Sequence, residues 1–128
     1  MLRLSPFQRA VLNEFEHTEQ AYLLPLMLSC GARFPEQPTE LIGRITVGAI
    51  CQLMRGGYLE AFYESTADEP DEPLAPPDAR DVLGLVRGGA LYFDDVRWRW
   101  NPTIGGEVRV GFRLTPWRGG VPGPGSLQ

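Results

Sequence analysis

The chain has 128 residues, of which 43% are hydrophobic and 22% are charged, so its length and composition fit one folded domain and exclude a disordered chain. Twelve arginines against sixteen acidic residues give a net charge of −4, and the sequence contains no lysine. The longest apolar segment, residues 21–28, is far shorter than the roughly 20 residues of a membrane-spanning helix. Two cysteines are too few for a disulfide scaffold, and no signal-peptide pattern opens the chain. We therefore expect a cytoplasmic protein that does not enter the membrane.

Two helices are predicted near the start of the chain. Ser5-Pro6 is typical of a helix start, because serine caps free backbone N–H groups and proline suits the first turn. A second apolar segment, Ala21–Cys30, ends at Gly31, which we expect to stop the helix. Pro25 lies inside this segment, so either the helix kinks there or a new helix begins there.

A third helix is predicted from Thr39, as its capping residue, to about Arg55, where Gly56-Gly57 closes it. The aromatic run that follows, Tyr58–Tyr63, favours a strand. Residues 65–77 then carry acidic side chains and four prolines, and such a composition cannot bury enough apolar surface to fold. We expect an exposed or mobile connection there.

The second half of the chain is predicted to contain a short helix and a hairpin. Asp78 can cap a helix over Ala79–Val86 that ends at Gly88-Gly89, and Asp94-Asp95 is interpreted as a turn. Apolar and arginine residues alternate over residues 96–100 and again over 108–114, with a turn between them, so we expect a hairpin with one apolar face. Its other face would carry Arg97, Arg99, Arg109 and Arg113. Residues 119–128, with four glycines and two prolines, are expected to form a disordered tail.

Two short segments resemble winged helix-turn-helix domains. The run Leu53-Met-Arg-Gly-Gly-Tyr-Leu59 resembles the end of that family's third helix and its first wing strand, and Arg113-Leu-Thr-Pro116 resembles the end of its last wing strand. The resemblance covers about residues 5–65 and 107–119, and residues 66–106 stand as an insertion where a short wing loop is usual. It implies a single α+β domain over residues 1–118. This domain would have a three-helix core, a C-terminal antiparallel hairpin or small sheet, and a short extra helix in the insertion.

The outward face of the third helix indicates what kind of partner the protein meets. Winged-helix proteins usually place this helix in the DNA major groove, where polar side chains read the bases. The predicted core face is Leu41, Ile42, Ile45, Ala49 and Leu53. The opposite row is Glu40, Arg44, Val47, Cys51 and Arg55. Because the centre of this row is apolar, it suits packing on protein, either another chain or the insertion, better than it suits DNA. The alternative is a helix buried on all sides.

No constellation of residues indicates catalysis. His17 is the only histidine, so a catalytic triad or a multi-histidine metal site lacks its parts. Cys30 and Cys51 lie in apolar helical segments, where a thiol is normally inert. We therefore expect a non-enzymatic protein with no cofactor and no metal.

The leading hypothesis is a small acidic binding protein of the immunity, antitoxin or adaptor type, with another protein as its partner. The residues expected to bind the partner are Arg44, Val47, Cys51, Arg55, Asp68, Glu69, Asp71 and Glu72. On this hypothesis Val47→Glu abolishes partner binding and leaves the fold intact. An accessory subunit of a larger assembly would use the same surfaces.

The alternative hypothesis is a dimeric DNA-binding regulator whose wing contacts phosphates through Arg97, Arg99, Arg109 and Arg113. The net charge of −4 opposes tight binding of DNA by a monomer, but a homodimer would bring two wings together. Two other interpretations compete with this one. The arginine face can be an ordinary solvated strand face, or it can pair with the acidic stretch between Asp68 and Asp81.

Overall fold

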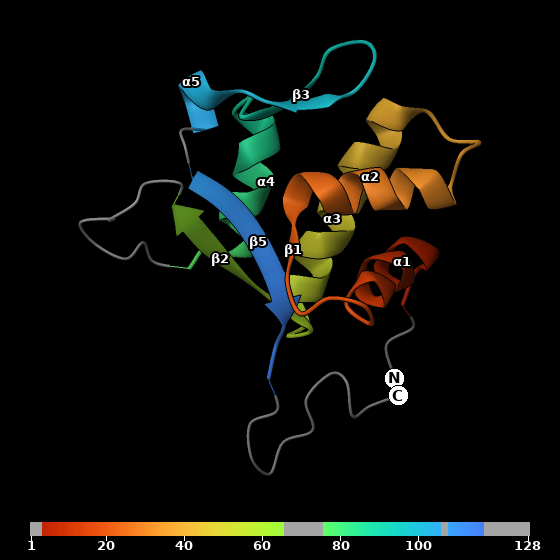
Figure 1. Cartoon of the computed structure of the whole chain (residues 1–128), viewed down its shortest axis with the longest axis vertical. Helices are drawn as coiled ribbons and strands as arrows, with labels where there is room; N and C mark the ends of the chain where they lie inside the picture. The colour runs from red at the N-terminus through yellow and green to blue at the C-terminus, as the bar shows by residue number, and fades with distance from the viewer. Residues whose placement is uncertain (1–3, 66–75, 106–107, 117–128) are drawn as a thin grey trace.

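The computed structural model describes residues 4–65, 76–105 and 108–116, and over these residues the chain has a mixed helix-and-strand fold (Figure 1). The predicted α+β class is therefore confirmed. In chain order the elements are α1 (Pro6–Glu14), β1 (Ala21–Tyr22), α2 (Leu23–Arg33), α3 (Thr39–Arg55), β2 (Leu59–Ser65), α4 (Ala79–Arg87), β3 (Leu91–Phe93), β4 (Trp98–Trp100), α5 (Pro102–Gly105) and β5 (Val108–Leu114). The predicted tail, residues 119–128, lies outside the described residues.

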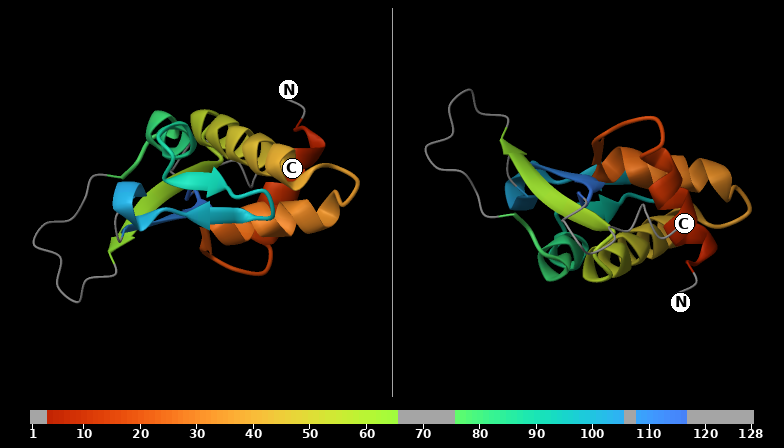
Figure 2. Two further views of the ribbon diagram at one scale, coloured as in Figure 1. Left: turned by 90° about the horizontal axis from the view of Figure 1, so that it is seen from above. Right: turned by 90° about the horizontal axis from the view of Figure 1, so that it is seen from below.

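The last strand of the chain is the central strand of the main sheet. The sheet is antiparallel, in the order β1-β5-β2. Phe112 of β5 pairs with Ala21 on one side and with Ala61 on the other. Phe112 and Val110 are buried and share one hydrophobic core with the helices, which gather to one side of the sheet (Figure 2). Because side chains alternate along a strand, the arginines of β5 lie on the opposite, exposed face.

Two helix starts predicted from their cap residues are confirmed. Ser5 caps α1, where its Oγ accepts a hydrogen bond from the N–H of Gln8 at 3.1 Å, and the Gln8 side chain accepts from the N–H of Ser5 at 2.7 Å. Asp78 caps α4 through the same reciprocal pair with Asp81. Each capping box satisfies backbone donors that the first helical turn leaves without an acceptor.

The predicted bounds of the third helix, Thr39–Arg55, are also confirmed. The predicted cap is wrong, because Pro38 occupies the N-cap position and no side chain caps the helix. At the other end, the N–H of Tyr58 donates to the carbonyl of Leu53 at 2.9 Å and Gly57 has a φ of +82°. That backbone conformation favours glycine, which is why the Gly-Gly pair ends the helix.

The second helix differs from its prediction at both ends. Residues 21 and 22 form β1, so the helix begins at Leu23 and Pro25 lies in its first turn. A backbone N–H in the first turn has no acceptor within the helix, so Pro25 breaks no hydrogen bond there. The predicted stop at Gly31 is wrong, since α2 continues to Arg33.

The predicted hairpin between residues 96–100 and 108–114 is wrong. β4 pairs with β3, and β5 pairs with β1 and β2. The reversal lies at Asp94-Asp95, which was correctly interpreted as a turn. The Asp94 side chain accepts hydrogen bonds from the N–H groups of Val96 and Arg97, and Asp95 has a φ of +75°. The expected turn after residue 100 contains α5 instead. Val96, predicted on the apolar face, is therefore at the tip of the β3–β4 hairpin and is 75% exposed.

Residues 76–105, between β2 and β5, fold back onto the rest of the chain, and most of the connection expected over residues 65–77 lies outside the described residues. Within residues 76–105, α4 lies along α3, and the β3–β4 hairpin lies over the end of α3 at which that helix begins (Figures 1 and 2). The short helix expected within the insertion is thus present, as α4.

Candidate functional site

The two faces of α3 are not divided as the sequence predicts. Leu41, expected in the core, is 44% exposed, while the other predicted core residues are buried or half-buried. On the opposite row, Arg44 and Arg55 are exposed as expected. Val47 and Cys51 are only 1% and 2% exposed, so the prediction that they face outward is wrong. They are not available to a partner in this structure.

The second half of α3 is covered by α4. The Cys51 thiol donates a hydrogen bond to the carbonyl of Ala79, in the first turn of α4, at 3.3 Å. Val82, one turn later, is fully buried in the core that both helices share. Burial raises the pKa of the Cys51 thiol above its ordinary value, and burial does the same for Cys30, which lies on the buried face of α2. The apolar row of α3 is therefore explained by packing under the insertion, to which α4 belongs.

The first half of α3 is covered by the β3–β4 hairpin. Trp98 is 4% exposed, and its Nε1 donates a hydrogen bond to the carbonyl of Thr39 at 3.1 Å. Its indole lies against Gly43, where any β-carbon would collide with the ring. On the outer side, the Arg44 guanidinium lies 5.7 Å from the centre of the Trp98 ring, and Arg44 also pairs with Glu40 at 3.3 Å. Gly43 inside the predicted helix was a signal in the sequence that another group packs closely there. That signal could not identify Trp98 as the group.

The four arginines of the predicted wing do not share one face. Arg97 and Arg99 belong to the β3–β4 hairpin, whereas Arg109 and Arg113 belong to the main sheet. Arg99 pairs with Asp94 and Arg113 pairs with Glu60, its cross-strand neighbour. The single arginine face is therefore a wrong prediction, and two of its four charges are neutralised within the chain.

The other two wing arginines lie in different surroundings. The Arg109 guanidinium lies 6.0 Å from the centre of the Tyr22 ring, on the exposed face of the sheet. Arg97 is exposed and forms no ion pair within the part of the chain that the structure describes. The acidic residues assigned to the partner, Asp68, Glu69, Asp71 and Glu72, lie outside the described residues.

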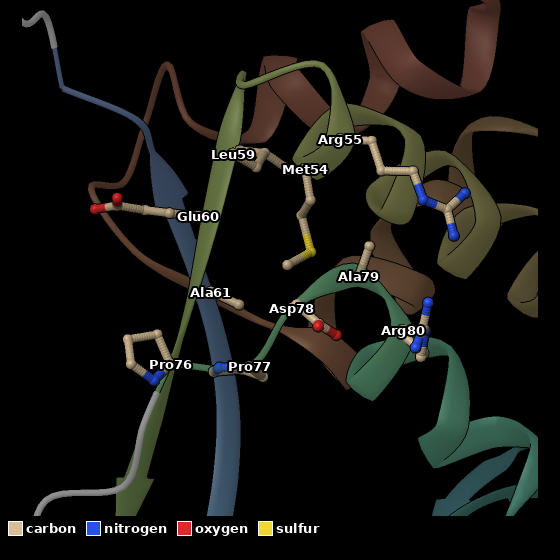
Figure 3. A pocket seen from close by; sticks show the side chains of 10 residues that line it. All are labelled: Met54, Arg55, Leu59, Glu60, Ala61, Pro76, Pro77, Asp78, Ala79 and Arg80. Carbon is tan, nitrogen blue, oxygen red and sulfur yellow. The ribbon is translucent and has the colours of Figure 1, made fainter.

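A pocket of about 450 Å³ opens where α3 ends, between the start of β2 and the start of α4 (Figure 3). Its apolar lining comes from Met54, Leu59, Ala61, Pro76 and Pro77. Its charged lining comes from Arg55, Glu60, Asp78 and Arg80. Arg55 was a predicted partner-binding residue, but no sequence signal connected it with Arg80, because packing of α4 on α3 is what brings the two helix ends together.

The two carboxylates of this pocket already have partners. Glu60 pairs with Arg113, and in Figure 3 its carboxylate points away from the pocket. Asp78 accepts the N–H of Asp81 at 2.8 Å, and this backbone hydrogen bond holds the pKa of Asp78 below its ordinary value. The guanidinium groups of Arg55 and Arg80 lie on one side of the pocket in Figure 3, and neither has an ion-pair partner among the residues described.

Other candidate chemistry is sparse in the described segments. His17 is exposed in the connection after α1. Within residues 4–65, 76–105 and 108–116, no three side chains of the metal-binding types lie close enough to hold an ion. The helices of the same segments include none with the length and apolar character of a membrane span.

No protein-family model matches the chain, and no curated protein or solved structure is significantly similar to it.

Proposed function

We propose that this chain is a non-enzymatic binding protein that engages another protein, on a core arranged like a winged-helix domain. The order helix, strand, helix, helix, strand, strand of α1, β1, α2, α3, β2 and β5 supports the proposed core. The central place of the last strand in the sheet supports it as well. In this description α4, β3, β4 and α5 are an insertion between the two wing strands.

The observation that carries the proposal is that the apolar row of α3, at Val47 and Cys51, is covered by the chain's own insertion. A DNA-reading helix must offer its outer face to the major groove, with polar donors and acceptors free. Here Val47 and Cys51 are buried, Cys51 under α4, and Trp98 closes the N-terminal end of the same helix. A winged-helix-like core whose third helix is covered in this way is better suited to binding proteins through its other surfaces. The immunity, antitoxin and adaptor types are proposed by analogy with other small acidic domains.

The alternative, a dimeric DNA-binding regulator, receives less support from the arginines. Arg99 and Arg113 have carboxylate partners, so the wing offers fewer uncompensated charges than its sequence suggests. Phosphate contacts by free arginines are what make binding to DNA strong at low salt. We therefore place protein binding first.

Two measurements test the proposal together. In gel retardation with mixed-sequence duplex DNA at low salt, we expect no shift from the intact chain. In cells that make the protein, a photo-crosslinking amino acid at position 55 should yield one recurring protein adduct. The same amino acid at position 17, an exposed site after α1, serves as the matched control and should not yield it. Salt-sensitive retardation of DNA without any position-dependent protein adduct would reverse the order of the two functions.

A further inference from the structure

The outer face of the main sheet, opposite the helices, has an aromatic centre. Tyr22 of β1 and Phe62 of β2 stand on either side of Gly111 of β5, and their ring centres lie 6.3 Å apart in an edge-to-face arrangement. A β-carbon at Gly111 would lie 2.3 Å from the Phe62 ring, so this ring rests directly on the central strand. Both rings are only half-buried, since the helices share their core with the other face. The centre of the outer face is therefore an apolar patch that is still open to contact.

Two charged rows flank this aromatic centre, one on each side along the strands. In the register of the sheet, Arg113 stands opposite Glu60. On the other side of the aromatic row, Arg109 stands opposite Glu64. Arg113 and Glu60 form an ion pair, and Figure 3 shows the Glu60 carboxylate on the side of β2 away from the pocket. The two rows have no net formal charge, but the arginines stand on β5 and the glutamates on β2.

This order of charges is complementary to a copy of itself. Two such sheets can pack face to face about a two-fold axis that runs parallel to the strands, between β5 and β2. Each β5 then lies over the β2 of the other copy, so Arg113 stands over Glu60 of the second copy and the reciprocal contact follows by symmetry. The Phe62 rings of the two copies meet near the axis. A two-fold axis across the strands would instead place Arg113 over Arg109, so the charges select the first arrangement.

The arginines of this face are already held by aromatic rings. The Arg113 guanidinium lies 5.7 Å from the centre of the Phe62 ring. The Arg109 guanidinium lies 6.0 Å from the centre of the Tyr22 ring. A side chain that its neighbours hold in place loses less freedom when it enters an interface. Aromatic residues and arginine are also the types that are enriched at the centres of interfaces.

We propose that a second copy of this chain packs on the outer face of the main sheet, with Phe62 at the centre and Arg113 of each copy over Glu60 of the other. The charge order on β5 and β2 favours a second copy over an unrelated protein, because an identical face supplies the matching order by symmetry. The net charge of −4 on each copy is largely screened beyond about 8 Å at physiological ionic strength. This dimer goes beyond the proposed function, and it uses neither α3 nor the β3–β4 hairpin.

The test measures the mass of the full chain by sedimentation equilibrium at physiological ionic strength, from micromolar to near-millimolar concentration. We expect a reversible equilibrium between monomer and dimer. R113E and E60R each place like charges over one another twice in the dimer, so each should raise its dissociation constant by at least about tenfold. The control, R97E, makes the same substitution at an exposed arginine of the β3–β4 hairpin and should stay within about twofold of the unmodified chain.

A mixture of R113E and E60R distinguishes an interface from a local effect. In a dimer with one chain of each, the acid introduced at position 113 faces the arginine introduced at position 60, and the natural pair remains at the second contact. The mixture should therefore form a heterodimer although each variant alone dimerises weakly. Each single variant leaves a like-charged cross-strand pair within its own sheet, so circular dichroism must show that it is folded. The double variant E60R/R113E restores opposite charges everywhere and should dimerise like the unmodified chain, even where a single variant does not fold.

Four outcomes overturn the inference. The first is a monomer at every concentration. The second is a dimer that R113E and E60R leave unchanged, because such a dimer uses another surface. The third is a mixture of the two weakened variants that stays monomeric, because the charges then act only within each chain. The fourth comes from a photo-crosslinking amino acid at position 62: adducts with a different protein, and none between two copies, would make this face a binding site for the partner.

Discussion

Trp98 packs against Gly43, so that the indole of the β3–β4 hairpin touches the backbone of α3 at a position where no side chain fits. We expect Gly43→Ala to force the ring away and to lower the free energy of unfolding by about 1–3 kcal/mol, as overpacked cores do. Urea denaturation measures this loss. Gly48→Ala is the matched control in the same helix, because a β-carbon there meets nothing within 4 Å. The control should gain stability, by about 0.5–1 kcal/mol, from better helix propensity.

We expect Val47→Glu to unfold the protein, and not merely to remove a contact with a partner. Val47 is 1% exposed, and a carboxylate in its place would be buried without a partner. We expect the free energy of unfolding to fall by about 3 kcal/mol or more. Gln52→Glu introduces the same side chain at an exposed position of α3, where it still accepts the hydrogen bond from Gln8. Thermal melts followed by circular dichroism distinguish the two variants, and equal melting temperatures would contradict the burial of Val47.

The pKa of Asp78 links the stability of α4 to pH. The folded state lowers this pKa, chiefly through the backbone hydrogen bond from Asp81, so the contribution of Asp78 is present above the unfolded pKa near 3.8. It is lost as the pH falls below that value and through the lower, folded-state pKa. Asp78→Asn keeps a capping acceptor but does not titrate, so it should remove part of the acid sensitivity while changing neutral stability little. Asp78→Ala should be less stable at neutral pH as well. Urea midpoints across the acid range measure both effects.

Reactivity of the two buried thiols reports whether α4 opens by itself. Burial raises the pKa of both Cys30 and Cys51, so neither should react quickly with a disulfide reagent in the native chain. Removing the α4 cap with Asp78→Ala should accelerate modification of Cys51 in a C30A background, because Cys51 lies under α4. The same cap variant should leave the rate for Cys30 in a C51A background nearly unchanged. Equal acceleration at both thiols would indicate global unfolding instead.

Local chemistry made the helix boundaries predictable from sequence. Ser5 and Asp78 satisfy backbone donors within their own first turns, and Gly57 ends α3 by a conformation that its own backbone permits. Such features depend on residues three or four positions apart, so they can be read without knowing the rest of the fold. Three helix ends were predicted wrongly: the start of α2 at Leu23, its stop at Gly31, and the cap of α3, where Pro38 stands. Neither helix start has a side-chain cap to mark the boundary.

Strand partners and the candidate site were not predictable in the same way. Alternation correctly placed Val110 and Phe112 inside, but it states only which face a residue occupies and not which strand lies beside it. β1 has two residues, too few to leave a periodic signal. Arg55 and Arg80 line one pocket, and Trp98 contacts Gly43, only because elements distant in the sequence pack together.

The order of strands in the main sheet has a consequence for biosynthesis. β1 and β2 do not touch each other as neighbours, since each bonds only to β5. Neither β1 nor β2 can pair in the main sheet until β5, which ends at residue 114, has been synthesised. Pairing across such a long stretch of chain is slow. A chain that ends before β5 therefore lacks the strand on which both β1 and β2 pair.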